Sequence, residues 1–242
     1  MAYGGRNDMT TSTLTEWDFC APSEPPAPLK PRMRGWIHAW ACLISVVCGI
    51  TLVSFAGGYA GPRAVGATAV YSLTVCAMFG VSAFYHRTQW QNAQSRGLMK
   101  RLDHSMIFLF IAGTYTPFCY LLLKPETYRW ILSVVWIGAL AGVVLKVCFP
   151  HSTRWLGVVL YLVLGWISLF MLPEILAGGG VTPVVLLAVG GALYSVGAVL
   201  YATKWPNPWP RTFGHHEFFH AATVVAAVCH HIAIWFAVVA SA

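Results

Sequence analysis

Long apolar stretches, separated by short breaks that contain charged, glycine or proline residues, occupy most of this chain after its first thirty residues. Each stretch is close to the roughly 20 residues that a helix needs to cross about 30 Å of hydrocarbon. The pattern therefore predicts an all-α, polytopic membrane protein in which residues 32–242 form a bundle of seven transmembrane helices. The fifth stretch is the shortest and ends at Pro173, before three consecutive glycines. The predicted spans are Trp36–Ala56, Ala64–His86, Asp103–Leu123, Tyr128–Val147, Trp155–Leu172, Val181–Thr203 and His216–Val239.

The segment before the first span has a different character. It is polar, and its prolines gather between Pro22 and Pro28. A segment of this composition cannot bury enough apolar surface to offset the entropy lost on folding, so residues 1–31 are predicted to be a disordered cytoplasmic tail. It also lacks the apolar core of a cleavable signal peptide, and the first span is therefore expected to serve as the insertion signal.

Composition and charge agree with this organisation. Hydrophobic residues make up 57% of the chain and charged residues only 10%, whereas soluble proteins carry about 25% charged residues. The net charge of +7 is spread among the linkers rather than gathered in one patch, so we expect no nucleic-acid partner. Twelve Lys and Arg residues fall on the side of the N-terminus and three on the other. Because cytoplasmic loops are enriched in these residues, the N-terminus is predicted inside and the C-terminus outside, in a multi-pass protein of the plasma membrane.

Three polar clusters interrupt the apolar spans, and ionisable side chains in such places are costly and by default functional. Ser82 and His86 end the second span, Asp103 begins the third, and His216 and His220 begin the seventh. Residues four apart share one face of a helix, about 6 Å apart along its axis. The charge count, which uses none of these residues, places all three clusters on the inner side of the membrane. The sequence therefore predicts one metal site that the three imidazoles hold.

Three neutral imidazoles with a fourth position open are typical of a catalytic zinc centre, in which the metal lowers the pKa of its bound water to about 7. Asp103 could act as general base on that water or ligate the metal directly, and Ser82 could donate a hydrogen bond to the water or to a developing oxyanion. A simpler interpretation also stands for each residue. Asp103 suits the N-terminal end of a helix dipole, Ser82 suits helix packing, and the histidines suit a headgroup interface.

The remaining polar residues of the spans are expected to lie outside the metal shell. His104 and His215 adjoin stronger candidates and are expected to face elsewhere, while Glu217 suits the first turn of its helix. His230 and His231 lie deep in the seventh span, about 15 Å beyond His220 along the helix, and either line a polar cavity or bond to neighbouring helices. His38, near the start of the first span, is expected at the interface.

Four segments of the chain form recognisable motifs: Ser82–His86 (SAFYH), Arg101–Ser105 (RLDHS), Ile111–Phe118 (IAGTYTPF) and Phe213–His220 (FGHHEFFH). Together they resemble the hemolysin III branch of the progestin and adipoQ receptor family, in a wider superfamily of membrane hydrolases that includes the alkaline ceramidases. The resemblance implies that zinc is held by His86, His216 and His220, that Asp103 contacts the metal-bound water, and that Ser82 stands close by. One departure precedes the first span, where many members carry a Glu and an Asn and this chain has Arg34 and its neighbours.

Three functions follow from these observations as hypotheses. The first is a zinc-dependent hydrolase that acts on an amide or ester of a membrane lipid, near the cytoplasmic side. The alternative is a receptor-like sensor of lipid or membrane state in which zinc is structural. A cytolytic pore is disfavoured, because permanent spans without a signal peptide leave no water-soluble form to secrete.

Overall fold

The structure, a computed structural model, describes residues 30–149 and 153–242. Nearly all of the tail predicted to be disordered lies outside these residues. The described part of the chain is helical and contains no strand. Its elements in chain order are α1 (Trp36–Tyr59), α2 (Pro62–Arg87), α3 (Ala93–Leu122), α4 (Pro125–Cys148), α5 (Arg154–Trp166), the 3₁₀ helix η2 (Ile167–Met171), α6 (Leu172–Gly179), α7 (Val181–Thr203) and α8 (His215–Ala240).

The predicted seven spans are confirmed. Six of the helices, and the α5–η2–α6 unit taken as one, are long and apolar enough to cross a membrane. Their outer surfaces carry large apolar side chains, such as Leu43 at 60% exposure, Val47 at 64% and Leu73 at 71%. A bundle that presents so many large aliphatic side chains outward needs hydrocarbon rather than water as its surroundings.

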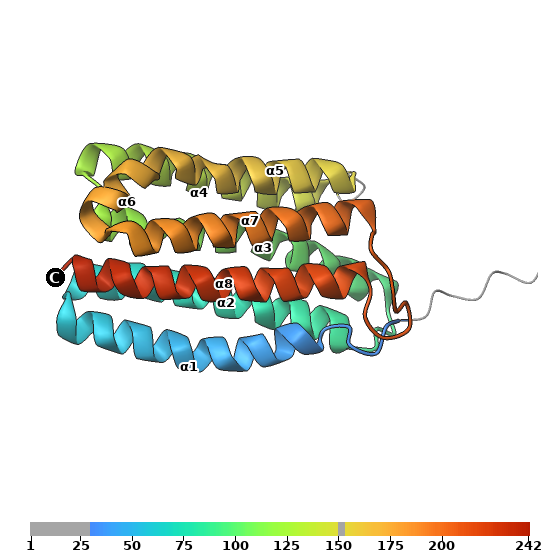
Figure 1. Cartoon of the computed structure of the whole chain (residues 1–242). Helices are drawn as coiled ribbons and strands as arrows, with labels where there is room; N and C mark the ends of the chain where they lie inside the picture. The colour runs from blue at the N-terminus through green and yellow to red at the C-terminus, as the bar shows by residue number, and fades with distance from the viewer. Residues whose placement is uncertain (1–29, 150–152) are drawn as a thin grey trace, which may run out of the picture.

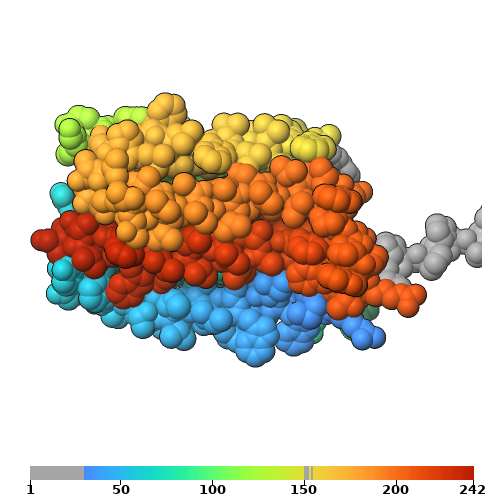
Figure 2. Space-filling model, viewed as in Figure 1, coloured from blue at the N-terminus to red at the C-terminus, as the bar shows by residue number. Residues whose placement is uncertain are grey.

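Consecutive helices pack side by side along the long axis of the bundle, as short linkers require (Figure 1). The last helix, α8, lies between α1 and α7 on one face (Figure 2) and also packs against α3. The first and last spans are therefore neighbours, so residues from both ends of the chain can meet inside the bundle.

Local sequence explains most helix boundaries. Pro62 and Pro125 occupy the first position of α2 and α4, where a backbone N–H would have no helical partner. The side chain of Asn92 accepts a hydrogen bond from the Gln94 amide and caps α3. As a result α3 begins ten residues before Asp103, the predicted start of the third span. The apolar pattern does not reveal this extension because residues 93–102 are mostly polar, although they form regular α-helix.

The fifth span is longer than predicted and is broken in the middle. Instead of ending near Pro173, the chain passes through η2 and continues as α6 to Gly179, with Pro173 in the first turn of α6 where it is tolerated. The Tyr115 hydroxyl lies 2.9 Å from the Leu164 carbonyl oxygen and 2.6 Å from that of Gly165. This phenol satisfies carbonyl groups that the change of helix type releases, as a membrane interior demands.

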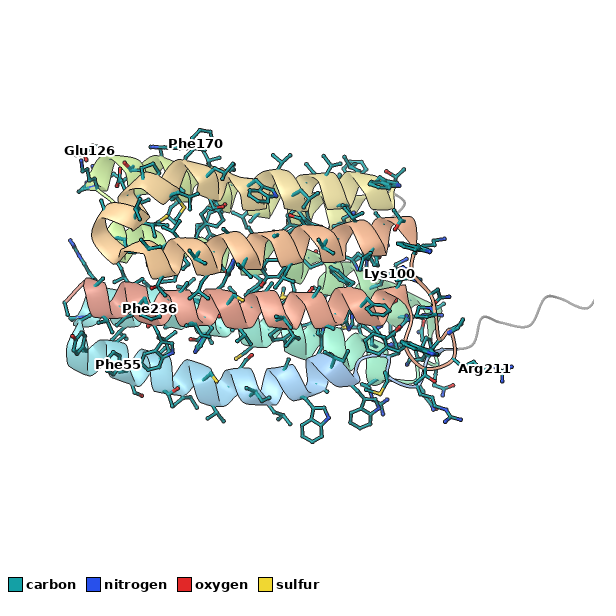
Figure 3. All side chains as sticks on the ribbon, in the orientation of Figure 1. Phe55, Lys100, Glu126, Phe170, Arg211 and Phe236 are labelled. Atoms are coloured by element: carbon teal, nitrogen blue, oxygen red, sulfur yellow. The ribbon has the colours of Figure 1, made fainter. Side chains whose placement is uncertain are left out.

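The charged side chains lie at the two ends of the bundle. Lys100 and Arg211 lie at the end where α1 and α8 begin, and Glu126 lies at the opposite end (Figure 3). The end with Lys100 and Arg211 is also the end at which the three predicted polar clusters are found.

Candidate metal centre

Three imidazoles from two helices converge at this end of the bundle. His86 is in the last turn of α2, and His216 and His220 are in the first two turns of α8. One ligand nitrogen from each lies within 4.8 Å of the other two, and the Nε2 atoms of His86 and His216 are 3.1 Å apart. His215, which the four-residue spacing excludes, is outside this group. The described residues thus contain a group of three histidines that could hold a metal ion.

The donor set fits a divalent cation that prefers nitrogen ligands. Zinc holds imidazole nitrogens at about 2.0–2.1 Å in a tetrahedron, which separates two ligand nitrogens by about 3.3 Å. The 3.1 Å between His86 and His216 is close to that value. A neutral imidazole ring presents one nitrogen without a proton, so three buried rings can turn three lone pairs toward one point. Iron, copper and nickel accept the same ligands, so the geometry indicates a class of metals.

A carboxylate stands beside the three imidazoles. Asp103 of α3 has its Oδ2 atom 4.0 Å from His86 Nε2, and it receives a side-chain hydrogen bond from buried Ser82, one turn before His86. The structure therefore brings together all five residues that the sequence analysis selected. Asp103 is too far from His86 for a direct hydrogen bond, and the space between them suits a water or a substrate atom.

His104 contacts Asp103, contrary to the expectation that it faces elsewhere. Its Nδ1 atom is 2.8 Å from the Lys100 carbonyl oxygen and 3.3 Å from Asp103 Oδ2. Because a carbonyl oxygen only accepts, Nδ1 carries the proton, and Nε2 accepts a hydrogen bond from the Tyr201 hydroxyl at 3.3 Å. This chain from α7 to α3 fixes the orientation of the Asp103 carboxylate.

His38 is part of the same cluster, although the sequence analysis placed it at the interface. It is 2% exposed, and its ring stacks on that of His220 with the centroids 3.7 Å apart. Neither of its ring nitrogens has a hydrogen-bond partner among the described residues. The signal that could have located it is its position near the start of the first span, at the same end of the bundle as the other histidines.

An ion pair links the start of α8 to the segment before α1. Arg34 Nε donates to Glu217 Oε1, and Glu217 Oε2 accepts from the Gly214 amide at 2.9 Å. Glu217 is 1% exposed, so this carboxylate is both the cap of α8 and the buried partner of Arg34. Arg34, at the departure from the family pattern, thereby gains a structural role next to His216.

Two features bring the Arg34 segment against the site. The amides of Arg32 and Met33 donate to the carbonyl oxygens of Arg211 and Thr212, at 3.0 and 3.2 Å. Gly35 has a φ of +82°, and a Cβ atom at this position would lie 2.8 Å from the Cβ of His86. Two independent reasons therefore favour glycine at this position: its backbone angle is left-handed, and a side chain here would collide with His86.

Positive charge collects outside the spans at this end. Burial, and after it the charges of Arg87, Arg34 and Arg96, lower the pKa of Lys30. The same cations give this end of the bundle a positive potential that favours anionic lipid headgroups.

A cavity of about 170 Å³ leads from the site into the bundle, whereas one water needs about 10–15 Å³ on this measure. Asp103 and His220 lie at its polar end, and Phe118, Met171 and Leu187 line it further along. Asp103 and Phe118 are fifteen residues apart on α3, so the cavity follows the helix for about 22 Å. Its lining is mainly apolar away from the site, which is typical of a pocket that binds a small molecule.

The two deep histidines of α8 separate in the structure. His230 lines the cavity, with its Nε2 atom 3.4 Å from the Leu187 carbonyl oxygen. His231 instead accepts a hydrogen bond from the Trp235 indole at 3.0 Å. His230 therefore lines the cavity and contacts the neighbouring helix α7, whereas the partner of His231 lies on the same helix, α8.

Comparison with known proteins gives a consistent result. Residues 27–231 match the family model described as "Haemolysin-III related". The chain is 29% identical to the "Hemolysin-3 homolog" of Bacillus subtilis over 187 residues, which cover 76% of this chain and 83% of that protein. It is 30% identical to "Hemolysin-3" of Bacillus cereus over 186 residues, or 76% of this chain and 80% of that protein. It is 26% identical to the human "Monocyte to macrophage differentiation factor" over 172 residues, which cover 69% of this chain and 68% of that protein.

Proposed function

We propose, from the premise that the chain belongs to the haemolysin-III-related family of integral membrane proteins, that it is a zinc-dependent hydrolase of a lipid amide or ester. The observation that carries the proposal is the Asp103 carboxylate, aimed at three imidazoles where the polar end of an apolar cavity begins. A purely structural metal site needs neither an oriented carboxylate nor a cavity that leads to it.

His86, His216 and His220 would hold the metal. Bound zinc would supply Lewis-acid chemistry, which polarises a carbonyl oxygen and makes water acidic enough to react near neutral pH. The chain's own residues supply the rest. The cavity binds the acyl chain and excludes water from it, so the carbonyl carbon of the amide or ester stops beside Asp103.

Asp103 would carry the proton of the attacking water in both steps of the reaction, the attack on the carbonyl carbon and the departure of the leaving group. One of its carboxylate oxygens takes a proton from the water that attacks the carbonyl carbon, and the carboxyl group then gives that proton to the leaving nitrogen or oxygen as the C–N or C–O bond breaks. The products are a fatty acid and an amine or alcohol, so atoms and charge balance. Ser82 and His104 orient the carboxylate, because each donates a hydrogen bond to it.

We also propose that the site lies near the cytoplasmic face, with the N-terminus inside and the C-terminus outside. The support is the predominance of Lys and Arg at the end of the bundle where α1 and α8 begin. At this depth the linkage between a lipid's headgroup and its chain is within reach of the site.

The test compares Asp103→Asn with His86→Ala in protein purified in detergent. Metal content is measured by mass spectrometry of the element, folding by thermal melting, and hydrolysis by release of fatty acid from a panel of N-acyl and O-acyl lipids. Asp103→Asn is expected to keep zinc and fold but lose at least a hundredfold in rate, as loss of a general base does. His86→Ala is expected to lose the metal. Glu126→Gln, a carboxyl-to-amide change at the opposite end, is the control.

The receptor-like alternative predicts a different outcome. If zinc only ties α2 to α8, Asp103→Asn leaves function intact and His86→Ala lowers thermal stability. Wild-type protein that binds zinc but releases no fatty acid from any lipid of the panel would overturn the hydrolase proposal.

A further inference from the structure

A second polar site lies in the middle of the cavity, away from the metal centre. Tyr194 of α7 and His230 of α8 both line the cavity, with their ring centroids 5.3 Å apart. Neither residue has a part in the proposed hydrolysis. His230 lies ten residues beyond His220 on the same helix, which places the two imidazoles about 15 Å apart along its axis.

The Tyr194 hydroxyl differs from the other hydroxyl groups of the cavity. Thr114, Ser195 and Thr223 each donate to the carbonyl oxygen four residues earlier in their own helix, at 2.8 Å. The Tyr194 hydroxyl is buried and has no partner among the described residues. A buried hydroxyl without a partner carries the full cost of its lost hydration, and an unsatisfied group in a native structure calls for an explanation.

His230 is also incompletely satisfied. Its Nε2 atom lies 3.4 Å from the Leu187 carbonyl oxygen, which is long for a hydrogen bond. The backbone of α7 makes room for this ring, because a Cβ atom added at Gly190 would collide with the imidazole. Gly190 therefore leaves room for the imidazole of His230 inside the bundle. Ionisable side chains within membrane spans are by default functional.

We propose that Tyr194 and His230 form a subsite that binds a hydroxyl group carried partway along the hydrocarbon chain of the ligand. The inference rests on the proposed function, in which the head of an acyl chain is held at the metal centre. An extended chain advances about 1.2 Å per bond, since the three bonds of a peptide unit span about 3.6 Å. A separation of about 15 Å therefore corresponds to about twelve bonds. The ligand class is a mid-chain hydroxylated acyl lipid.

The hydrogen bonds balance in this arrangement. The ligand hydroxyl can accept from the Tyr194 phenol and donate to a neutral imidazole nitrogen of His230, so both side chains gain a partner. A plain hydrocarbon chain would leave the phenol unsatisfied. The subsite would therefore select among chains of equal length, which the metal centre cannot do.

The test is a competition between two fatty acids, the products of the proposed hydrolysis. Zinc-loaded protein in detergent is incubated with equal amounts of octadecanoic acid and 12-hydroxyoctadecanoic acid, and both are quantified in the protein and in the free micelles by mass spectrometry. Dividing the bound ratio by the micellar ratio removes the effect of partitioning. The hydroxy acid is expected to be enriched about threefold to tenfold on the wild type, the effect of one net hydrogen bond.

Variants decide whether Tyr194 is responsible. Tyr194→Phe is expected to reduce the enrichment to about one while octadecanoic acid still binds. Thr223→Val, which removes a cavity hydroxyl already bonded within its helix, is the matched control and should keep the enrichment. 2-Hydroxyoctadecanoic acid, with its hydroxyl next to the head, should give a ratio that Tyr194→Phe does not change.

The outcomes distinguish this inference from the proposed function. If octadecanoic acid binds but the hydroxy acid is not enriched, or if Tyr194→Phe keeps the enrichment, the subsite is wrong and the hydrolase proposal stands. If neither acid binds, the cavity does not hold acyl chains, and both proposals fail together.

Discussion

Breaking the ion pair between Arg34 and Glu217 by removing Arg34 should lower stability measurably, because the remaining partner is fully buried. The exposed fraction of the side chain is 1% for Glu217 and 21% for Arg34. Removing one partner of a buried pair costs about 3–5 kcal/mol, since the other charge is left uncompensated. Arg34 is partly accessible to water, and Glu217 keeps its bond from the Gly214 amide, so the lower limit applies to Arg34→Met. At about 2–4 °C per kcal/mol for a domain of this size, the melting temperature should fall by about 6–12 °C.

A double-mutant cycle tests the physical cause. Arg34→Met and Glu217→Gln are made singly and together, and thermal unfolding is followed by circular dichroism in detergent with a chelator present, so that metal binding does not contribute. The double variant should melt above Arg34→Met, because no charge then remains buried. Arg129→Met, an exposed position at the other end, should leave the melting temperature within about 1 °C. Additive losses in the double variant would refute the coupling and, with it, the role assigned to Arg34.

Four further predictions follow. Gly35→Ala should lower stability by about 1–2 kcal/mol, because the backbone angle of Gly35 is left-handed, and it should weaken metal binding by displacing His86. Gly58→Ala, where an added Cβ meets open space, should have neither effect. Thermal melting measures the change in stability, and titration with zinc measures the change in metal binding. Chelation should remove about 2.7 kcal/mol of stability from protein held at a free zinc concentration a hundred times its Kd, and His86→Ala should abolish this difference in melting. His38→Phe should keep the ring stack on His220 and the fold, whereas His38→Ala should destabilise the protein by about 2 kcal/mol or more, because it leaves a cavity beside that ring; thermal melting separates the two. Exposed Cys148 should react with a membrane-impermeant maleimide in inverted vesicles and not in intact cells, and labelling of intact cells would reverse the proposed orientation.

The features that the sequence predicted well are those that depend only on how far along the long axis of the bundle a residue lies. Hydropathy located all seven spans, and the charge count placed Ser82, His86, Asp103 and the α8 histidines at one depth. Two residues four apart on a helix must share a face, so the pair His216 and His220 needed no tertiary information. The convergence of α2 with α8 then followed from common depth and from the family motifs.

The features that sequence missed depend on how each helix is rotated about its own axis. Depth alone could have suggested His38 but could not reveal its stack on His220, because a quarter turn of α1 would direct it to lipid. The same holds for His104, whose neighbour Asp103 points into the site with it. The pairing of Arg34 with Glu217 joins residues 183 positions apart, and nothing local to either one encodes it.

The site's two halves are made at different times. His86 and His216 are separated by 130 residues, so α2 is inserted well before the ribosome has produced α8. A chain interrupted before its last helix presents a single ligand and cannot capture the ion. For the proposed metal, acquisition would therefore be the closing step of biogenesis, and each newly made copy would first pass through a metal-free stage.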